Sequence, residues 1–300
     1  SKENELVLIN GRYEGIDQRL VDNHIDVKVI DDFSSGTREC VTTGVEVWEK
    51  DLSSVDIDDL TNFFKGADVV FHMAARARVQ PSIENPIPFN KANIEGTLRV
   101  LMAANNAGVK RVVYSASSSC YGDTSDLPTP EHSKKDPVSP YGLQKYVGEQ
   151  YCELFSKIYG LDTVSLRYFN VYGPGMRADG AYALVLAVWQ KQFKEGKPLT
   201  ITNDGNQRRD FTHVDDVVSA NILAATHSKD LSGTAFNIGN GKSYSMNEVV
   251  DMIGVDRKYG EKRLEPFETL ADNTLAKNIL GWKPTGSLKE FIEKYFEKIN

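Results

Sequence analysis

Short runs of β-branched residues alternate with longer segments of helical periodicity along the first half of the chain. The apolar runs lie at 6–9, 27–30, 45–48, 69–71, 112–114 and 163–166. Between them, segments 89–106 and 141–159 carry apolar residues at the spacing of a helix face. Continuous apolar strands separated by helices indicate a parallel sheet that is covered on both faces. We therefore predict an α/β fold built on a doubly wound parallel sheet.

After Arg167 the alternation loosens, which indicates a second, smaller lobe. The pattern predicts a turn-rich segment, then a helix, a strand, a helix and a strand, at 168–175, 182–193, 199–201, 214–225 and 234–238. Ser245-x-x-Glu248 and Ser287-x-x-Glu290 are typical of capping boxes that open helices. We predict that the sheet domain takes residues 1–168 and about 212–240. The smaller α/β lobe takes about 169–211 and 241–300, so the chain crosses between the two more than once.

Composition excludes several classes of partner. The formal net charge of −7 gives no general attraction to nucleic acid or to an anionic membrane surface. The chain has no apolar run of about 18 residues, the length of a membrane span, and it begins without a signal-peptide pattern. Cys40, Cys120 and Cys152 are too widely spaced for a disulfide framework or a metal cluster. We expect no nucleic-acid partner, no membrane, no metal and a reducing, cytoplasmic compartment.

The segment SPYGLQKYVGE (139–149) carries the clearest chemical signal. Tyr141 and Lys145 stand at positions i and i+4, which lie on one face of a helix with Cβ atoms about 5–6 Å apart. A free tyrosine has a pKa near ~10, and a neighbouring ammonium lowers that pKa by stabilising the phenolate. The pair can therefore act as a general acid or base toward a hydroxyl group. A plain pair on an exposed helix is the alternative.

A serine cluster follows the apolar run at 112–114, in VVYSASSSCYG (112–122). Ligands of doubly wound sheets bind outside the carboxyl ends of the strands, where this cluster is expected. Ser117 could donate or relay a hydrogen bond between a substrate hydroxyl and Tyr141. The alternative is a serine-rich turn that only caps the strand.

Ser117, Tyr141 and Lys145 resemble the catalytic triad of the extended short-chain dehydrogenase/reductases, the NAD-dependent epimerase/dehydratase family. Further matches follow in order nearly from end to end: Asp31, HMAA (72–75), NIEGT (93–97), RYFNVYGPG (167–175), RRDFTHVDDVV (208–218), FNIGNG (236–241) and LADNTLAKNILGW (270–282). Within the family the chain is most similar to UDP-glucose/UDP-N-acetylglucosamine 4-epimerases. The resemblance implies a Rossmann-type sheet, a UDP-sugar substrate and a homodimer formed through segments 89–106 and 141–159.

The resemblance also implies roles for individual residues. Tyr141 would be the catalytic acid/base, Lys145 would hold the nicotinamide ribose and tune Tyr141, and Ser117 would bind the sugar's 4-hydroxyl. Asn170 and Arg209 would contact the nucleotide diphosphate, with Arg263 as a further candidate. The implied substrate-binding residues are Ser82, Ser117, Ser118, Asn170, Leu199, Arg209, Arg263 and Thr269.

A carboxylate at the end of the second strand favours NAD as the cofactor. Asp31 can accept hydrogen bonds from ribose hydroxyls and would repel the 2′-phosphate of NADP. By resemblance, Asp51 and Leu52 flank the adenine, and small residues after the fourth strand permit close approach. The implied cofactor-binding residues are Gly11, Gly15, Asp31, Asp51, Leu52, Met73, Ala74, Ala75, Asn93, Tyr141, Lys145 and Tyr168.

The phosphate loop after the first strand departs from the family pattern. LINGRYEGID (8–17) carries Gly11 and Gly15, whereas TGxxGxxG supplies three glycines for backbone approach to the pyrophosphate. The interval before the second strand is also about one helical turn short for a strand–helix–strand unit. Either the loop is truly short and holds the cofactor less firmly, or a few residues of a longer natural loop are absent from the sequence as given. The intact later motifs favour the second explanation.

The residues beside Ser117 favour epimerisation. Ser118, Ser119 and Cys120 stand where related dehydratases carry an acidic pair and related UDP-glucuronate decarboxylases a glutamate. We expect oxidation and reduction at C4 through a 4-keto sugar, with NAD tightly bound. The small Thr269 leaves room for an N-acetyl group, so UDP-GlcNAc/UDP-GalNAc could react beside UDP-Glc/UDP-Gal. The alternatives are a UDP-glucuronate epimerase or decarboxylase, a 4,6-dehydratase, a 4-reductase, or a non-catalytic nucleotide-sugar-binding homologue.

Overall fold

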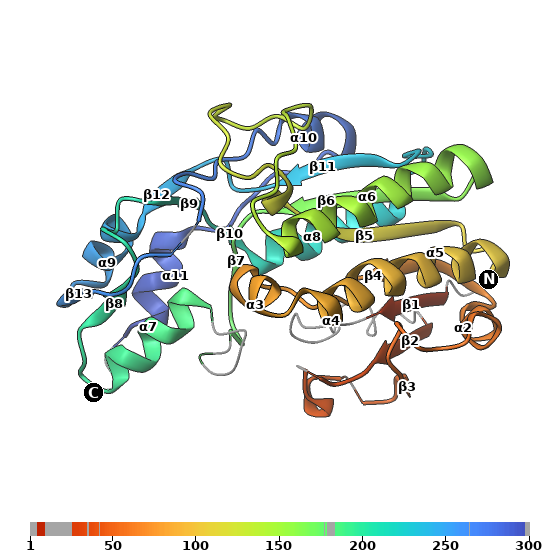
Figure 1. Cartoon of the computed structure of the whole chain (residues 1–300), viewed down its shortest axis with the longest axis horizontal. Helices are drawn as coiled ribbons and strands as arrows, with labels where there is room; N and C mark the ends of the chain where they lie inside the picture. Colours follow the sequence, from red (N-terminus) through yellow and green to blue (C-terminus); the bar gives the residue numbers. More distant parts are fainter. Residues whose placement is uncertain are drawn as a thin grey trace. The chain divides into compact units, whose positions relative to one another are not determined.

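The computed structural model describes residues 5–9, 26–34, 36–41, 43–176, 178, 184–263 and 265–297, with 5–9 and Cys40 as backbone only. The chain forms two compact units (Figure 1). The first takes residues up to Ser119, Ser139–Arg167 and Asn221–Phe236. The second takes Cys120–Val138, Tyr168–Ala220 and the chain from Asn237 onward. Gly11 and Gly15 lie outside the described residues, so the expected phosphate loop stays a prediction.

A seven-stranded sheet organises the first unit. Its strands lie in the order β11 (Thr234–Ile238), β6 (Asp162–Tyr168), β5 (Arg111–Ser117), β4 (Ala67–His72), β1 (Glu5–Ile9), β2 (Asp26–Asp31), β3 (Glu46–Glu49). The pairings of β1 with β2 and β4, of β2 with β3 and of β4 with β5 are parallel. Strand order reverses at β1, which creates the switch point where such sheets bind ligands. The predicted α/β doubly wound parallel sheet is confirmed.

Helices pack along this sheet and build the core. They are α2 (Ile57–Phe64), α3 (Val79–Glu84), α4 (Pro86–Asn90), the π-helical turn η2 (Lys91–Glu95), α5 (Gly96–Ala107) and α6 (Pro140–Tyr159), with short 3₁₀ turns η1 (Arg38–Cys40) and η3 (Ser118–Cys120). Helix α5 packs against both α2 and α6, and Figure 1 shows α5 and α6 running along the strands. Leu60, Phe64, Leu101, Val112 and Phe155 lie in the core between helices and sheet.

Two buried contacts fix α6 on the sheet. Arg167 of β6 donates from Nε to Glu149 Oε2 at 2.8 Å and from Nη2 to Oε1 at 2.5 Å, with both side chains almost fully buried. Gly148 lets β5 approach, because an added Cβ would lie 2.3 Å from Tyr114 Oη. Tyr114 Oη in turn donates to Lys145 O at 3.3 Å. The part of α6 that carries Lys145 therefore lies tightly against β5.

The second unit contains short strand pairs and helices. Its elements are β7 (Val171–Tyr172), α7 (Val185–Lys194), β8 (Leu199–Ile201), β9 (Arg208–Asp210), β10 (Thr212–His213), the start of α8 (Val214–Thr226), β12 (Ser243–Ser245), α9 (Met246–Ile253), β13 (Arg257–Tyr259), α10 (Thr274–Leu280) and α11 (Leu288–Tyr295). Strand β10 pairs with β7, β12 with β9 and β13 with β8. Trp189, Leu199, Val250 and Ile292 lie in its core.

The helix starts expected at Ser245 and Ser287 are both present, and they differ in how completely the capping box is formed. The capping box of Ser245 and Glu248 is complete, with both reciprocal hydrogen bonds. At α11 the structure shows only half of the predicted capping box: Ser287 Oγ accepts from Glu290 N at 3.3 Å. Both serines therefore begin a helix where the sequence places it.

Candidate active site

The three predicted catalytic residues lie on two neighbouring elements of the first unit. Ser117 ends β5, and Tyr141 and Lys145 lie in the first two turns of α6, which packs against β5. Helix α6 begins here because Ser139 caps it: Ser139 Oγ accepts from Gly142 N at 3.1 Å, and Pro140 takes the first helical position. The i, i+4 relation inferred from the sequence is therefore present on a real helix.

Lys145 is buried and bound to the sheet. Its Nζ donates to Ser115 O at 2.7 Å and lies 4.9 Å from the centroid of the Tyr114 ring. The side chain is only 4% exposed, and this desolvation lowers its pKa from 10.5 to about 7. An ammonium in such a dry setting interacts strongly with any nearby negative charge, including a phenolate.

Ser117 is oriented by its neighbour Ser119, a contact that sequence reasoning missed. Ser117 Oγ accepts from Ser119 Oγ at 2.8 Å and from Ser119 N at 3.2 Å. Because Ser117 is the acceptor in both bonds, its own proton can be donated to a substrate oxygen. Ser118, the other predicted contact, is half-buried in the η3 turn beside it.

A hollow of about 130 Å³ gathers most of the predicted adenosine-side residues. Its lining includes Asp31, Asp51, Leu52, Ala74 and Ala75, together with Ser34, Lys50, Arg76 and Lys91. It follows the carboxyl ends of β2 and β4, on either side of β1, as expected for a dinucleotide in this type of sheet. A carboxylate, an apolar side chain and two small alanines fit the ribose and adenine of NAD.

Asp31 is the polar centre of this hollow. Its Oδ1 accepts from Phe33 N at 2.7 Å. Desolvation raises the pKa of the Asp31 carboxyl to about 6, with the Phe33 hydrogen bond acting in the opposite direction. Hydrogen bonds from ribose hydroxyls would replace lost solvation, whereas a second anion such as a 2′-phosphate would not. Met73, in the same loop as Ala74, is half-buried.

Asn93 occupies the π-helical turn and links three segments. Its Oδ1 accepts from Arg76 N at 2.7 Å, and its Nδ2 donates to Arg76 O at 2.8 Å and to Gln144 Oε1 at 3.0 Å. The residue is buried, and both amide protons are used in these bonds. Asn93 thus joins the loop after β4 to α6, next to Lys145, and its place near the nicotinamide, which the resemblance implied, stays a prediction.

A second chain of hydrogen bonds leads from Asn93 to the sheet. Thr97 Oγ1 donates to Asn93 O at 2.7 Å, so His72 Nε2 must be the donor in its 2.8 Å contact with Thr97 Oγ1. Burial, assisted by the charge on Lys145, lowers the pKa of His72 to about 3. The histidine is therefore neutral and does not place a second cation beside Lys145.

Ser82 lies in α3 and is fully buried. Its Oγ donates to Val79 O at 2.6 Å and accepts from Tyr141 N at 3.1 Å. The hydroxyl is thus bound to protein on both sides. This placement differs from the direct sugar contact that the resemblance implied.

In the second unit, Asn170 and Thr269 come together. Asn170 Nδ2 donates to Thr269 Oγ1 at 2.9 Å and to Asp210 O at 3.1 Å, and Thr269 N donates to Arg208 O at 3.1 Å. Asn170 has a φ of +23°, a conformation that asparagine adopts more readily than most residues. Tyr168, which ends β6, is half-buried.

The two predicted arginines differ in their surroundings. Arg209 pairs through Nη2 with Glu265 at 2.5 Å and donates from Nη1 to Pro266 O at 2.9 Å. Arg263 is exposed, and its backbone N donates to Asn203 Oδ1 at 2.9 Å. Leu199 lies fully buried in the core at β8, so its side chain packs against protein.

Sequence reasoning missed the carboxylate that organises this region. Asp210 is fully buried and accepts from Asn240 N at 2.8 Å, Gly241 N at 2.9 Å and Ala271 N at 3.0 Å. Burial raises the pKa of the Asp210 carboxyl to about 6, against the effect of these hydrogen bonds. Asp210 thereby joins the FNIGNG and LADN segments, which the sequence marked as motifs without showing their contact.

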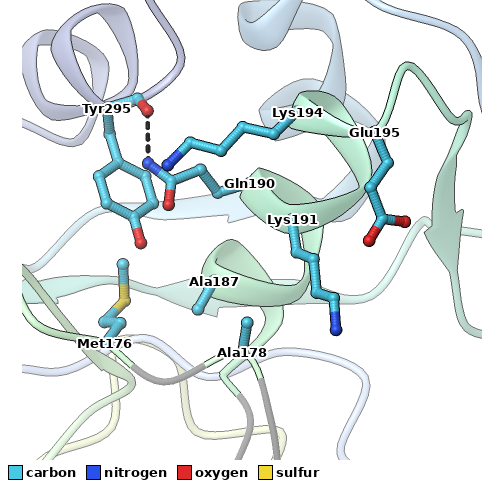
Figure 2. Close-up of a pocket in the computed structure, with 8 residues that line it drawn as sticks. All are labelled: Met176, Ala178, Ala187, Gln190, Lys191, Lys194, Glu195 and Tyr295. Atoms are coloured by element: carbon cyan, nitrogen blue, oxygen red, sulfur yellow. Dashed lines mark hydrogen bonds between the residues drawn. The ribbon is translucent and has the colours of Figure 1, made fainter.

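The larger hollow in the second unit, about 340 Å³, contains none of the predicted site residues. Figure 2 shows its lining by one face of α7 and by Met176, Ala178 and Tyr295, with Gln190 Nε2 donating to Tyr295 O at 2.8 Å. Lys191 and Lys194 lie in the last turn of α7, where cations complement the helix dipole. These lysines therefore have a structural explanation.

The described residues contain neither a candidate metal site nor a candidate membrane-spanning helix. Within the ranges given above, no group of three or more His, Cys, Asp or Glu side chains could hold a metal ion. None of the helices seen there is both long and apolar enough to cross a bilayer.

Comparison with known proteins gives a consistent result. Residues 16–239 match the model of the NAD dependent epimerase/dehydratase family. UDP-glucose 4-epimerase of Mycolicibacterium smegmatis is 34% identical over 296 residues, covering 94% of this chain and 93% of that protein. The crystal structure of UDP-glucose 4-epimerase with UDP-glucose from Thermotoga maritima has a TM-score of 0.90 at 33% identity, covering 97% and 98% of the two chains.

A UDP-N-acetylglucosamine 4-epimerase is similarly close. The structure of that enzyme from Methanobrevibacter ruminantium, in complex with UDP-N-acetylmuramic acid, has a TM-score of 0.89 at 32% identity. The match covers 99% of this chain and 97% of that one.

Proposed function

This chain belongs to the NAD-dependent epimerase/dehydratase family, and we propose that it is a UDP-sugar 4-epimerase, an isomerase that works with tightly bound NAD. The observation that carries the proposal is the placement of Ser117, Tyr141 and Lys145 on β5 and α6. Relatives that match over almost the whole chain, among them enzymes named for UDP-glucose and UDP-N-acetylglucosamine, support the same reaction.

The chemistry assigned to this chain is proton transfer and orientation at C4. Bound NAD supplies the reversible hydride acceptor. Tyr141, as phenolate, takes the proton of the 4-hydroxyl while C4 is oxidised, and Ser117 donates a hydrogen bond to the same oxygen. After the 4-keto sugar has rotated to present its other face, Tyr141 returns the proton to O4 while C4 is reduced on that face. Lys145 favours the phenolate through its buried charge.

NAD binding is assigned to residues 1–168 and about 212–240, and nucleotide-sugar binding to about 169–211 and 241–300. The hollow around Asp31, Asp51 and Leu52 supports the first assignment. In the second unit, the bonded pair of Asn170 and Thr269 beside the strand of Arg209 supports contacts to the nucleotide sugar. Arg209 would exchange part of its pairing with Glu265 for the diphosphate.

The sugar range is proposed to include N-acetylated hexoses. Thr269 is a small side chain held by Asn170, so it leaves space that a bulky aromatic residue would fill. Thr269→Tyr should abolish turnover of UDP-GlcNAc and leave UDP-Glc turnover within about three-fold, because only the N-acetyl group needs this space. Coupled assays on both sugar pairs check this. Wild-type activity on plain hexoses alone would refute the proposal.

A homodimer through segments 89–106 and 141–159 is also proposed. Leu143, Leu154 and Ile158 on α6 are 51%, 44% and 63% exposed, and Met102 on α5 is 38% exposed. Neighbouring exposed apolar residues on adjacent helices are typical of an interaction surface. Sedimentation analysis should give a dimer that Leu154→Glu dissociates. A wild-type monomer would contradict this assignment.

The buried free thiols Cys120 and Cys152 agree with a reducing compartment such as the cytoplasm.

The test is a product assay on a panel of UDP-sugars followed by NMR. We expect inversion at C4 by protein that retains NAD through purification, and loss of at least about a thousand-fold in Tyr141→Phe, which keeps the ring but not the acid/base group. A 4-keto-6-deoxy product would indicate a dehydratase, and a pentose product a decarboxylase. Ligand binding without turnover would indicate a non-catalytic homologue.

A further inference from the structure

The backbone of the acid/base residue is held by a side chain from another helix. Tyr141 lies in the first turn of α6, where backbone N–H groups have no partner within the helix. Ser139 satisfies the N–H of Gly142 from the cap position, and Ser82 satisfies the N–H of Tyr141 from α3. The hydrogen bond of Ser82 therefore acts on the one residue whose phenol performs the proton transfer.

The geometry of Ser82 leaves its hydroxyl only this role. The residue is 0% exposed, and its single proton goes to Val79 O at 2.6 Å. One lone pair then accepts from Tyr141 N at 3.1 Å. A hydroxyl so placed is shielded from solvent and is bonded to protein on both sides, and one of its two partners is the backbone of Tyr141.

Helix α3 is itself connected to the cofactor hollow. The chain that leaves β4 lines the hollow with Ala74, Ala75 and Arg76, and Asn93 binds both backbone groups of Arg76. The same chain continues into α3 and reaches Ser82. One short segment therefore borders the NAD hollow at one end and holds the Tyr141 backbone at the other.

We propose that Ser82 is a positioning residue for Tyr141. It fixes the position of the phenol relative to the loop that borders NAD, without touching substrate or cofactor. This inference rests on the proposed function, in which Tyr141 is the acid/base. Proton transfer is sensitive to such placement, since a shift of about 1 Å can cost about a hundred-fold in rate.

The chain offers a matched control at the other end of α6. Ser156 Oγ donates to Leu161 O at 2.6 Å and accepts from Thr163 N at 3.2 Å, which repeats the bonding of Ser82 away from Tyr141. Ser82→Ala and Ser156→Ala each remove a hydroxyl that bonds one backbone carbonyl and one backbone N–H, although Ser156 is only half-buried and its Oγ also lies 2.9 Å from Thr163 Oγ1. A general loss of structure should affect both variants alike. A positioning effect should appear in Ser82→Ala alone.

The experiment compares NAD-loaded wild type, S82A, S82C and S156A. For S82A we expect kcat to fall about ten-fold or more, with KM for the UDP-sugar and the NAD content changed less than about two-fold. S82C, which keeps a weak donor and acceptor of similar size, should fall in between. S156A should keep kcat within about two-fold while losing as much thermal stability as S82A.

A second readout needs no substrate. The ionisation of Tyr141 is followed as the phenolate absorbance of each protein minus that of its Tyr141→Phe counterpart. Displacing the phenol from the buried ammonium should raise its midpoint by about half a pH unit or more in S82A and leave it unchanged in S156A. Equal midpoints in wild type and S82A, or equal loss of kcat in S82A and S156A, would overturn the inference. An inactive wild type with a shifted S82A midpoint would instead contradict only the proposed function.

Discussion

Replacing Lys145 with methionine should change the pH dependence of stability in a defined direction. Burial lowers the pKa of Lys145 to about 7, whereas the unfolded chain keeps the ordinary 10.5. Above the unfolded pKa the lysine is neutral in both states, and the folded protein has its full stability. As the pH falls through the folded pKa this stability is lost, because the buried ammonium then destabilises the folded state. Between these values the unfolded chain binds a proton that the folded chain does not, so wild-type stability rises with pH.

The size of this effect follows from the two pKa values. From pH 7 to pH 10, the penalty that the Lys145 ammonium imposes on folding shrinks by about 3.5 kcal/mol. Methionine has a similar unbranched shape and does not titrate. The difference in free energy of unfolding, wild type minus Lys145→Met, should therefore increase by about this amount over the interval. At pH 7 the variant should be the more stable protein, although it lacks the hydrogen bond to Ser115 O.

Denaturant unfolding of nucleotide-free protein at pH 7 and pH 10 measures this difference, since bound NAD would add its own linkage. Comparing the two proteins cancels the titrating groups that do not interact with Lys145. The variant should also lose epimerase activity, which would show that the buried ammonium is retained for catalysis at a cost in stability. Parallel pH profiles for the two proteins would refute the reasoning, because they would mean that the ammonium is not desolvated in the fold.

Two further predictions concern the seating of α6. Gly148→Ala should lower the free energy of unfolding by about 1–3 kcal/mol, because its Cβ would lie 2.3 Å from Tyr114 Oη and 2.7 Å from Cζ; wild-type stability in a urea titration would show that β5 and α6 are less tightly packed. Glu149→Met should cost about 3–5 kcal/mol by leaving the Arg167 guanidinium buried without this carboxylate, and adding Arg167→Met should recover most of that loss. Additive losses in the double variant would contradict this ion-pair account.

Local patterns were sufficient to predict most of the sheet and the long helices. The strand predicted at 234–238 coincides with β11, and the segment 141–159 forms all but the first residue of α6. Both succeed because periodicity and caps are encoded in neighbouring residues, such as Ser139 and Pro140 before Tyr141. The segment 89–106 instead contains a π-helical turn, whose Asn93 bonds to the distant Arg76 and Gln144, and no local pattern encodes those partners.

The site shows the same division between local and distant information. Spacing alone placed Tyr141 and Lys145 on one helix face, and a position after a strand placed Ser117 near them. What each hydroxyl or carboxylate contacts depends on segments far apart in the chain. For this reason the sequence could not reveal that Ser82 meets the Tyr141 backbone, that Glu265 pairs with Arg209, or that Asp210 joins two later motifs.

The central claim is that C4 loses and regains its own hydride while O4 exchanges its proton with Tyr141. Incubating the enzyme with UDP-glucose carrying deuterium at C4, in ordinary water, tests this by NMR of the product. The account predicts UDP-galactose that retains deuterium at C4, because the hydride leaves that carbon and returns to it without mixing with solvent. Product carrying hydrogen at C4 would contradict the account.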